Sequence, residues 1–335
     1  MLSTIRKQLH RRLAITVLAS SMAALSGSAV ASNAQTDSLD KIHFLIPGGA
    51  GGGWDMTARG TGEVLSKAGL VEKVSYQNLS GGGGGKAIAH LIETAKRQDD
   101  TLMVNSTPIV VRSLSGIFPQ SFRDLTPVAA TIADYGAIVV AADSPFTDWK
   151  QVVKQYSENP RSIKISGGSA RGSMDHLIAA AAFKGEGFDP RKVRYIAYDA
   201  GGKAMAALLS GETELLSTGL GEVLEMNKSG QVRVLAITAP KRLPAAPSIP
   251  TLVEQGNDTI FANWRGFFAA PGVSQAKIDA WNQALSGMYT TNEWAVVRDR
   301  NGWIDTYKND KDFFQFLEQQ EKQMGDLMRE LGFLQ

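Results

Sequence analysis

The sequence predicts an α/β protein of two lobes, each a mainly parallel sheet flanked by helices. Apolar segments of strand length alternate with amphipathic segments of helix length, and glycine-rich turns join many of these strands to the following helix. This alternation is the pattern of parallel sheets with crossover helices. The chain has 335 residues, and cores of that size usually divide into two domains.

Composition excludes several classes of protein. The chain has no cysteine, so disulfide scaffolds and thiolate metal sites are excluded. Hydrophobic residues make up 43% and charged residues 20%, as in ordinary globular proteins. The 35 Lys and Arg residues are nearly balanced by 33 Asp and Glu and form no stripe, so no nucleic-acid partner is expected.

The first 31 residues are expected to be a signal peptide. They carry four basic side chains and no acidic one, so their removal turns the net charge of +2 into −2. A basic stretch precedes the apolar run 13–25 and small residues that suit cleavage after Ala31 or Ala34. A membrane anchor is the alternative, but the apolar run is short for a bilayer. The mature protein is therefore expected in the periplasm.

The predicted first lobe covers residues 37–135 and 263–335. Its strands are expected at 42–46, 71–77, 102–104 and 264–270. Its helices are expected at 55–67, with Asp55 as the N-cap, at 86–95, and at the C-terminus, where an apolar stripe from Phe313 to Leu331 ends before Gly332.

The predicted second lobe covers residues 136–262 and begins with a strand at 137–141. The further strands are expected at 163–166, 193–197, 214–217 and 232–238. The helices between them are expected at 149–156, 174–183, 204–209 and 223–227.

Glycine-rich turns are the main functional signal. The turn at 47–53 contains five glycines between a strand and a helix, where backbone N–H groups can approach an anion closely. Similar turns lie near Gly81, Ser169, Gly201 and Gly219. Ligands of open parallel sheets bind at the carboxyl ends of the strands, where these turns lie. Tight turns without a ligand are the alternative for any single loop.

Motifs for nucleotides and for catalysis are incomplete. A P-loop at 80–87 fails because Ser80 replaces the first glycine and Ala87 replaces the final Ser or Thr. The turn around Ser169 misses the nucleophile elbow because Arg171 replaces its last glycine. No catalytic residue, cofactor or metal is therefore expected.

Taken together, the turns resemble the tripartite tricarboxylate transporter receptors, a family of periplasmic solute-binding proteins that includes the Bug proteins. The resemblance extends over essentially the whole mature chain. It rests on the segments 46–49 with Asp55 and Arg59, 78–85, 105–107, 168–176, 198–202, 234–242 with 250–251, and 264–266 leading to Pro271.

The resemblance implies a periplasmic binding protein of the two-lobed Venus-flytrap type (type II), which clamps a carboxylate between its lobes. The implied partners are the large and small integral subunits of a membrane transporter. The implied binding residues of the first lobe are Gly49, Gly51, Gly52, Trp54, Asp55, Asn105, Ser106 and Thr107, with Arg265 on the returning strand. Those of the second lobe are Ser169, Arg171, Gly172, Ser173, Asp199, Gly201, Gly202, Thr218 and Gly219.

Two arginines depart from the family pattern and suit an additional carboxylate. Arg171 and Arg265 could each hold one through a bidentate fork, which favours a tricarboxylate such as citrate. A solvated Arg171, or an Arg265 paired to a structural acid, is the alternative. An enzyme acting on a small carboxylate and a receptor that feeds a sensor kinase are the alternative functions.

Overall fold

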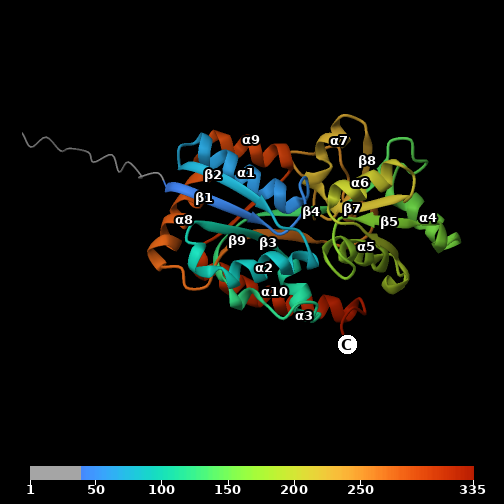
Figure 1. Ribbon diagram of the computed structural model, residues 1–335. Coiled ribbons are helices and arrows are strands. Elements are labelled where there is room, and N and C mark those ends of the chain that lie inside the picture. The colour runs from blue at the N-terminus through green and yellow to red at the C-terminus, as the bar shows by residue number, and fades with distance from the viewer. Residues whose placement is uncertain (1–38) are drawn as a thin grey trace, which may run out of the picture. The chain divides into compact units, whose positions relative to one another are not determined.

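The computed structural model describes residues 39–335, so the predicted signal peptide lies outside the described residues. Two sheets share one long strand, β4 (Thr126–Ala141). Figure 1 shows the two sheets following one another along this strand. Residues 37–335 form a single compact unit. The lobe boundaries at 135/136 and 262/263 therefore stay a prediction.

The first sheet is mixed rather than uniformly parallel. Strands β2, β1 and β3 are parallel, whereas β9 is antiparallel to both β3 and β4, and β10 is antiparallel to β4. In spatial order its strands are β2 (Val71–Asn78), β1 (Leu39–Ile46), β3 (Thr101–Ser106), β9 (Ala262–Ala269), the first part of β4, and β10 (Ile304–Lys308).

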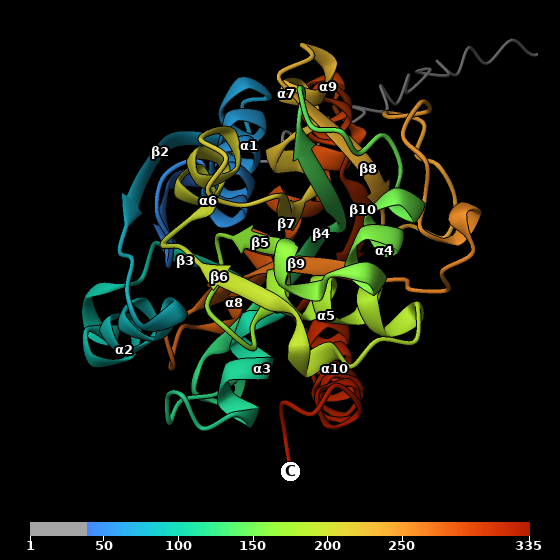
Figure 2. The ribbon, with the colours of Figure 1, turned by 90° about the vertical axis from the view of Figure 1, so that its right-hand side faces the viewer.

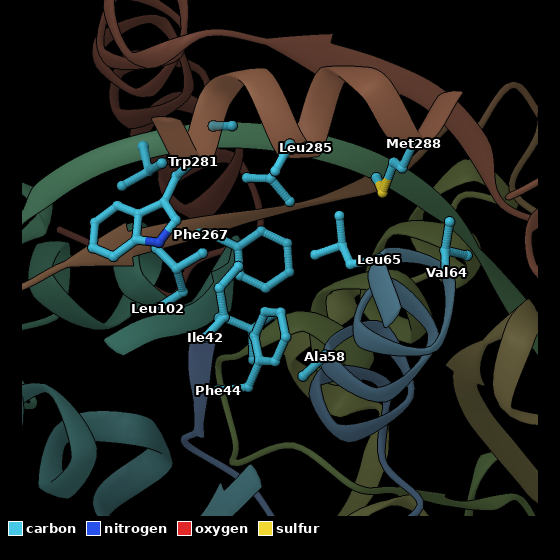
Figure 3. Close-up of a cluster of buried hydrophobic side chains, with 14 of the residues drawn as sticks. Ile42, Phe44, Ala58, Val64, Leu65, Leu102, Phe267, Trp281, Leu285 and Met288 are labelled. Atoms are coloured by element: carbon cyan, nitrogen blue, oxygen red, sulfur yellow. The ribbon is translucent and has the colours of Figure 1, made fainter. Parts of the chain in front are cut away.

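Helices cover both faces of the first sheet because its strands are apolar on both sides. Phe44 belongs to one buried cluster and its neighbour Leu45 to the other, as the two-residue period of a strand requires. One face carries α1 (Gly53–Lys67), α8 (Gln275–Gly287) and α9 (Asn292–Asn301); Figure 3 shows Leu65 and Trp281 from these helices around Phe44 and Phe267. The other face carries α2 (Gly85–Glu93), α3 (Pro108–Leu114) and α10 (Asp310–Glu330).

The second sheet has the same three-layer construction. Its order is β6 (Arg194–Ala197), β5 (Lys164–Gly167), β7 (Leu215–Gly219), the second part of β4, and β8 (Val232–Ile237). Helices α4 (Trp149–Glu158) and α5 (Met174–Gly185) pack on one face, and α6 (Gly201–Leu209) and α7 (Leu224–Lys228) on the other. Figure 2 views this sheet from its own end, with α6 and α5 on opposite sides of it.

Strand β4 begins eleven residues before the predicted strand at 137–141. Its first part pairs with β9 and its last residues pair with β7 and β8. Gly136, where the predicted second lobe begins, lies within the strand. A Cβ added to it would come 2.7 Å from the Ile178 side chain of α5. The glycine therefore allows close packing of a helix on the strand and does not end it.

Helix α10 confirms the predicted C-terminal stripe. Phe313 and Leu317 pack under the first sheet, whereas Met328 and Leu331 pack with Leu177 of α5. The helix ends before Gly332, which has φ of +76°. One helix thus stabilises both halves of the described chain. The elements α3, α8, α9 and β10 were not predicted.

Candidate functional site

A cavity of about 310 Å³ lies between the loops of the two sheets. Loops that follow β1, β2 and β3 line it from one side, and loops that follow β5, β6 and β7 line it from the other. Asn263 and Arg265 of β9 complete the lining. This volume is at the small end of ligand pockets and suits a small molecule.

The structure brings half of the predicted site residues into this cavity. Those that line it are Gly49, Gly52, Trp54, Ser106, Ser169, Ser173, Asp199, Gly201 and Arg265. Those that do not line it are Gly51, Asp55, Asn105, Thr107, Arg171, Gly172, Gly202, Thr218 and Gly219. The loops converge as expected for the carboxyl ends of strands. The binding roles of these residues stay predictions.

Asp55 organises the first glycine loop from behind. Its carboxylate accepts hydrogen bonds from the Gly51 N–H at 3.0 Å, from Asn78 Nδ2 at 3.0 Å and from Arg59 Nε at 2.9 Å. Helix α1 begins at Gly53 with Gly52 as its N-cap, so the prediction of Asp55 as the N-cap was wrong. The carboxylate stands in the first turn instead, where it reaches back to the loop.

Arg265 is the cation of the cavity. Its side chain is 2% exposed, and its Nη2 lies 3.1 Å from Asp134 Oδ2 while its Nη1 donates to Thr57 Oγ1 at 3.2 Å. A Cβ on Gly53 would collide with the guanidinium, so the cation lies directly beside the first residue of α1. The helix N-terminus and the guanidinium both favour an anion at this end of the cavity.

The Arg265 Nε group has no hydrogen-bond partner within the described chain. Burial of an unpaired N–H of a charged group is costly. Arg265 thus pairs with a buried acid, which was the alternative that the sequence left open, and it also lines the cavity, so its binding role stays a prediction.

Asp134 ties the site to the turn after β7. Its Oδ1 accepts from the Gly221 N–H at 3.3 Å, and its Oδ2 pairs with Arg265. Burial raises the pKa of this carboxyl to about 6, although Arg265 and the backbone N–H groups of Gly221 and Leu220 oppose the rise.

Asp175, in the first turn of α5, lies beside the turn at 167–172 that was expected to hold a ligand anion. The Ser169 hydroxyl and the backbone N–H groups of Gly168 and Ser169 stabilise its charged form, yet burial still raises its pKa to about 6. Asp175 also lines the cavity. The turn at 167–172 thus has an internal carboxylate facing its backbone donors, which the sequence analysis missed.

Glu222 is a further lining residue that the sequence analysis missed. It follows β7 and lies so close to the first residue of α6 that a Cβ on Gly201 would collide with its Oε2. Burial, then the nearby Asp175, raises the pKa of the Glu222 carboxyl to about 8. A single glutamate after a glycine turn carries no pattern, so no sequence signal could have found it.

Arg171 lies outside the cavity lining. Its side chain is exposed, and its Nη1 donates to the carbonyl oxygen of Tyr195 at 3.2 Å. Nearby, His176 Nδ1 accepts from the Gly172 N–H at 2.9 Å and the ring stacks on Tyr195. Burial, together with the charge of Arg171, lowers the pKa of His176 to about 4, so this ring is neutral at pH 7.

The loops on opposite sides of the cavity touch one another. Ser80 Oγ donates to Asp199 Oδ1 at 2.9 Å, and an added Cβ on Gly49 would lie 2.9 Å from the Ala200 Cβ. The cavity is therefore in a closed arrangement, in which loops from both sheets contribute to its wall.

Residues 39–335 contain no group of three or more potential metal-binding His, Asp or Glu side chains. In the same part of the chain, no helix is both long enough and apolar enough to cross a membrane.

A small closed cavity between two α/β sheets, with a buried cation and helix N-termini at its wall, defines a solute-binding protein. Residues 58–333 match the family described as the tripartite tricarboxylate transporter family receptor, and the chain belongs to this family. These proteins are solute-binding receptors and not enzymes. BugT of Bordetella pertussis is 28% identical over 274 residues, which cover 78% of this chain and 80% of BugT.

Solved structures of similar proteins show the same fold. The periplasmic binding protein BugD aligns with a TM-score of 0.76 at 19% identity, covering 88% of this chain and 98% of BugD. An R. palustris protein with adipate gives 0.78 at 21%, covering 88% and 97%. MatC from Rhodopseudomonas palustris with bound malate gives 0.74 at 18%, covering 86% and 98%. The α/β periplasmic binding protein fold is thus confirmed.

Proposed function

We propose that this protein captures a small carboxylate in the periplasm and delivers it to the large and small integral subunits of a tripartite transporter. The observation that supports this most directly is the cavity wall at Arg265. A buried guanidinium lies there beside the N-terminus of α1, and both favour an anion. The malate and adipate bound by two proteins of the same fold are carboxylates of suitable size.

The charge of the cavity bears on which carboxylate binds. Arg265 is already paired to Asp134, and Asp175 and Glu222 also line the wall. A ligand with three negative charges would meet these carboxyl groups with a single guanidinium to offset them. The tricarboxylate such as citrate that the sequence predicts therefore remains one candidate, and a dicarboxylate suits the charges of the wall better.

Export is part of the proposal. Residues 1–31 have the order of a signal peptide, and relatives of this fold are periplasmic. Delivery to membrane subunits follows from the family, whose description names a tripartite transporter.

Thermal unfolding of the protein from residue 32 onward tests the proposed function. Citrate, malate and adipate are added separately, with glucose as a neutral control. We expect at least one acid to raise Tm, because a ligand that binds only the native state stabilises it, and we expect mass spectrometry to recover that acid unchanged. If glucose alone raised Tm, or if the bound acid were converted, the proposal would be overturned.

A further inference from the structure

Three carboxyl groups lie near one guanidinium beside the cavity. Asp175 of α5 and Glu222 after β7 line its wall, whereas Asp134 of β4 is buried, does not line it and pairs with Arg265. Asp134 and Asp175 each act on Glu222, and Arg265 acts on all three carboxyl groups. One positive charge offsets only one carboxylate in such a buried region. The carboxyl group with the fewest compensating contacts is therefore the one that takes up a proton most readily.

Asp134 and Asp175 each have strong compensation for a negative charge. Asp134 pairs with Arg265 at 3.1 Å and accepts a hydrogen bond from the Gly221 N–H. The carboxylate of Asp175 faces the Ser169 hydroxyl and two backbone N–H groups of its own turn. Both carboxyls have pKa values of about 6 and are ionised above pH 7.

Glu222 has less compensation than either neighbour. Within residues 39–335 no cation lies in ion-pair distance of its carboxyl group. Asp175 and Asp134 disfavour its charged form, and only Arg265 and the Thr218 hydroxyl oppose them. Glu222 nevertheless lines the cavity, so a proton that it carries can be offered to a ligand.

We propose that Glu222 is a neutral carboxylic acid at pH 7 that donates its proton in a hydrogen bond to a carboxylate oxygen of the ligand. It is thereby a specificity-determining residue of the cavity. This inference rests on the proposed function, because it requires a carboxylate in the same cavity. It deepens that function, since it assigns to the second sheet a hydrogen-bond donor in addition to Arg265 of the first sheet.

A second observation indicates that the ligand lies near this wall. Arg265 lines the same cavity, although its side chain is only 2% exposed. A carboxylate has two oxygens and about four acceptor positions, so it can accept from the guanidinium and from a protonated carboxyl group together. A ligand with a neutral or cationic group at this place would leave those donors unsatisfied.

The hydrogen bond predicts a specific pH dependence. Between pH 7 and 9 Asp134 and Asp175 keep their charges, and burial holds Tyr195 of β6 neutral. Asp199, which lines the cavity before α6, forms an exposed pair with Lys203 of α6. Glu222, with a pKa of about 8, is the group facing the cavity whose charge changes in this range. Its ionisation removes the donor and adds a negative charge that repels the ligand.

Calorimetric titration with malate and with adipate tests the proposal. For the wild type we expect affinity to fall by up to about tenfold per pH unit above pH 8, with proton uptake on binding. Glu222→Gln keeps an N–H donor of similar shape, so it should retain affinity within about threefold at pH 7 and bind without pH dependence or proton uptake. Glu222→Ala should lose about tenfold or more at pH 7.

Glu225→Gln is the matched control, because Glu225 is an exposed glutamate three residues further on that pairs with Lys228. It should behave as the wild type. If Glu222→Gln lost as much affinity as Glu222→Ala, or kept the pH dependence, Glu222 would not act as a neutral donor. Wild-type affinity in Glu222→Ala would also overturn the proposal. If neither malate, adipate nor citrate bound the wild type, the proposed function itself would fail.

Discussion

Arg265 and Asp134 show how a single residue pair serves both stability and binding. The two side chains are 2% and 1% exposed, so each charge depends on the other to offset the loss of water. The pair joins β9 to β4, and Asp134 continues the connection to the turn before Glu222 through the Gly221 N–H. Arg265 is therefore held in place by Asp134 of β4 and not by a residue of its own strand, β9.

Asp134→Asn removes the negative charge and keeps the shape of the side chain. We expect it to lower the free energy of unfolding at pH 7 by about 3 kcal/mol, since it leaves a buried guanidinium without its partner. Urea unfolding measures the change. Asp326→Asn removes the exposed pairs with Lys322 and Arg329 and should leave the free energy of unfolding nearly unchanged, because exposed ion pairs contribute little. Equal effects of the two substitutions would contradict the argument.

Arg171 received a binding role in the sequence analysis, but the structure places it at the surface. Its guanidinium donates to a backbone carbonyl of β6 and does not line the cavity. We therefore expect Arg171→Ala to bind malate, adipate and citrate with affinities within about twofold of the wild type. Calorimetry is the measurement, after a check that the variant melts normally. A selective loss of citrate affinity would restore the original assignment.

At the scale of elements, the closed arrangement depends on two strand-to-helix loops that approach without side chains between them. Gly49 precedes α1 and Ala200 precedes α6. A Cβ added to Gly49 would lie 2.9 Å from the Cβ of Ala200, so the loops leave no space for a side chain at position 49. Ala200 itself has φ of +81°, an uncommon conformation for a residue other than glycine. Tertiary contacts, including the hydrogen bond from its N–H to the Gly168 carbonyl, hold it there.

Gly49→Val tests this contact. Its backbone conformation is open to any residue, so the fold should tolerate the substitution, but the added methyl groups should keep the two loops apart. We expect an unchanged Tm in the absence of ligand and an affinity for malate or adipate lower by about tenfold or more. Gly287→Ala near the end of α8, where an added Cβ makes only ordinary contacts, is the control. Unchanged affinity would show that closure does not need this approach.

At the scale of the whole molecule, three segments connect the halves. Strand β4 pairs with strands of both sheets, the chain returns into β9 at Ala262, and the last turns of α10 pack on α5. The first two lie at the predicted lobe boundaries, 135/136 and 262/263. Because Ser80 and Asp199 make contact across the cavity, this structure corresponds to the closed state.

We expect the ligand to shift the protein toward this closed state by hinge bending. Small-angle scattering should therefore give a smaller radius of gyration for the protein saturated with malate or adipate than for the ligand-free protein. Gly49→Val should keep the larger value at the same ligand concentration. An identical radius for the free and saturated wild type would argue against closure on binding.

Sequence patterns were most informative where they are local. Residues 42–46 are mostly apolar, 71–77 combine Val71, Val74 and Tyr76 with polar side chains, and a glycine-rich turn follows each segment. Both strands appear close to their predicted positions. Local reasoning failed where packing decides the outcome. In α9 only Trp294, Val297 and Asn301 are buried, and so few apolar positions are not enough to predict a helix from the sequence. Strand β4 begins at Thr126 and not after Gly136 as predicted, because Gly136 lies inside the strand and makes room for α5.

The sequence by itself determined the α/β class and the glycine loops at the carboxyl ends of the strands. These follow from periodicity and from the freedom of glycine, which are local properties, whereas the binding role of Arg265 was implied by the resemblance to the family and stays a prediction. Only the tertiary structure decided that Asp175 and Glu222 face the cavity and that Asp134 pairs with Arg265 beside them. Asp134, Asp175 and Glu222 are far apart along the chain and meet solely because β4, α5 and the turn after β7 pack together. Burial then changes their pKa values, and burial is a property of the fold.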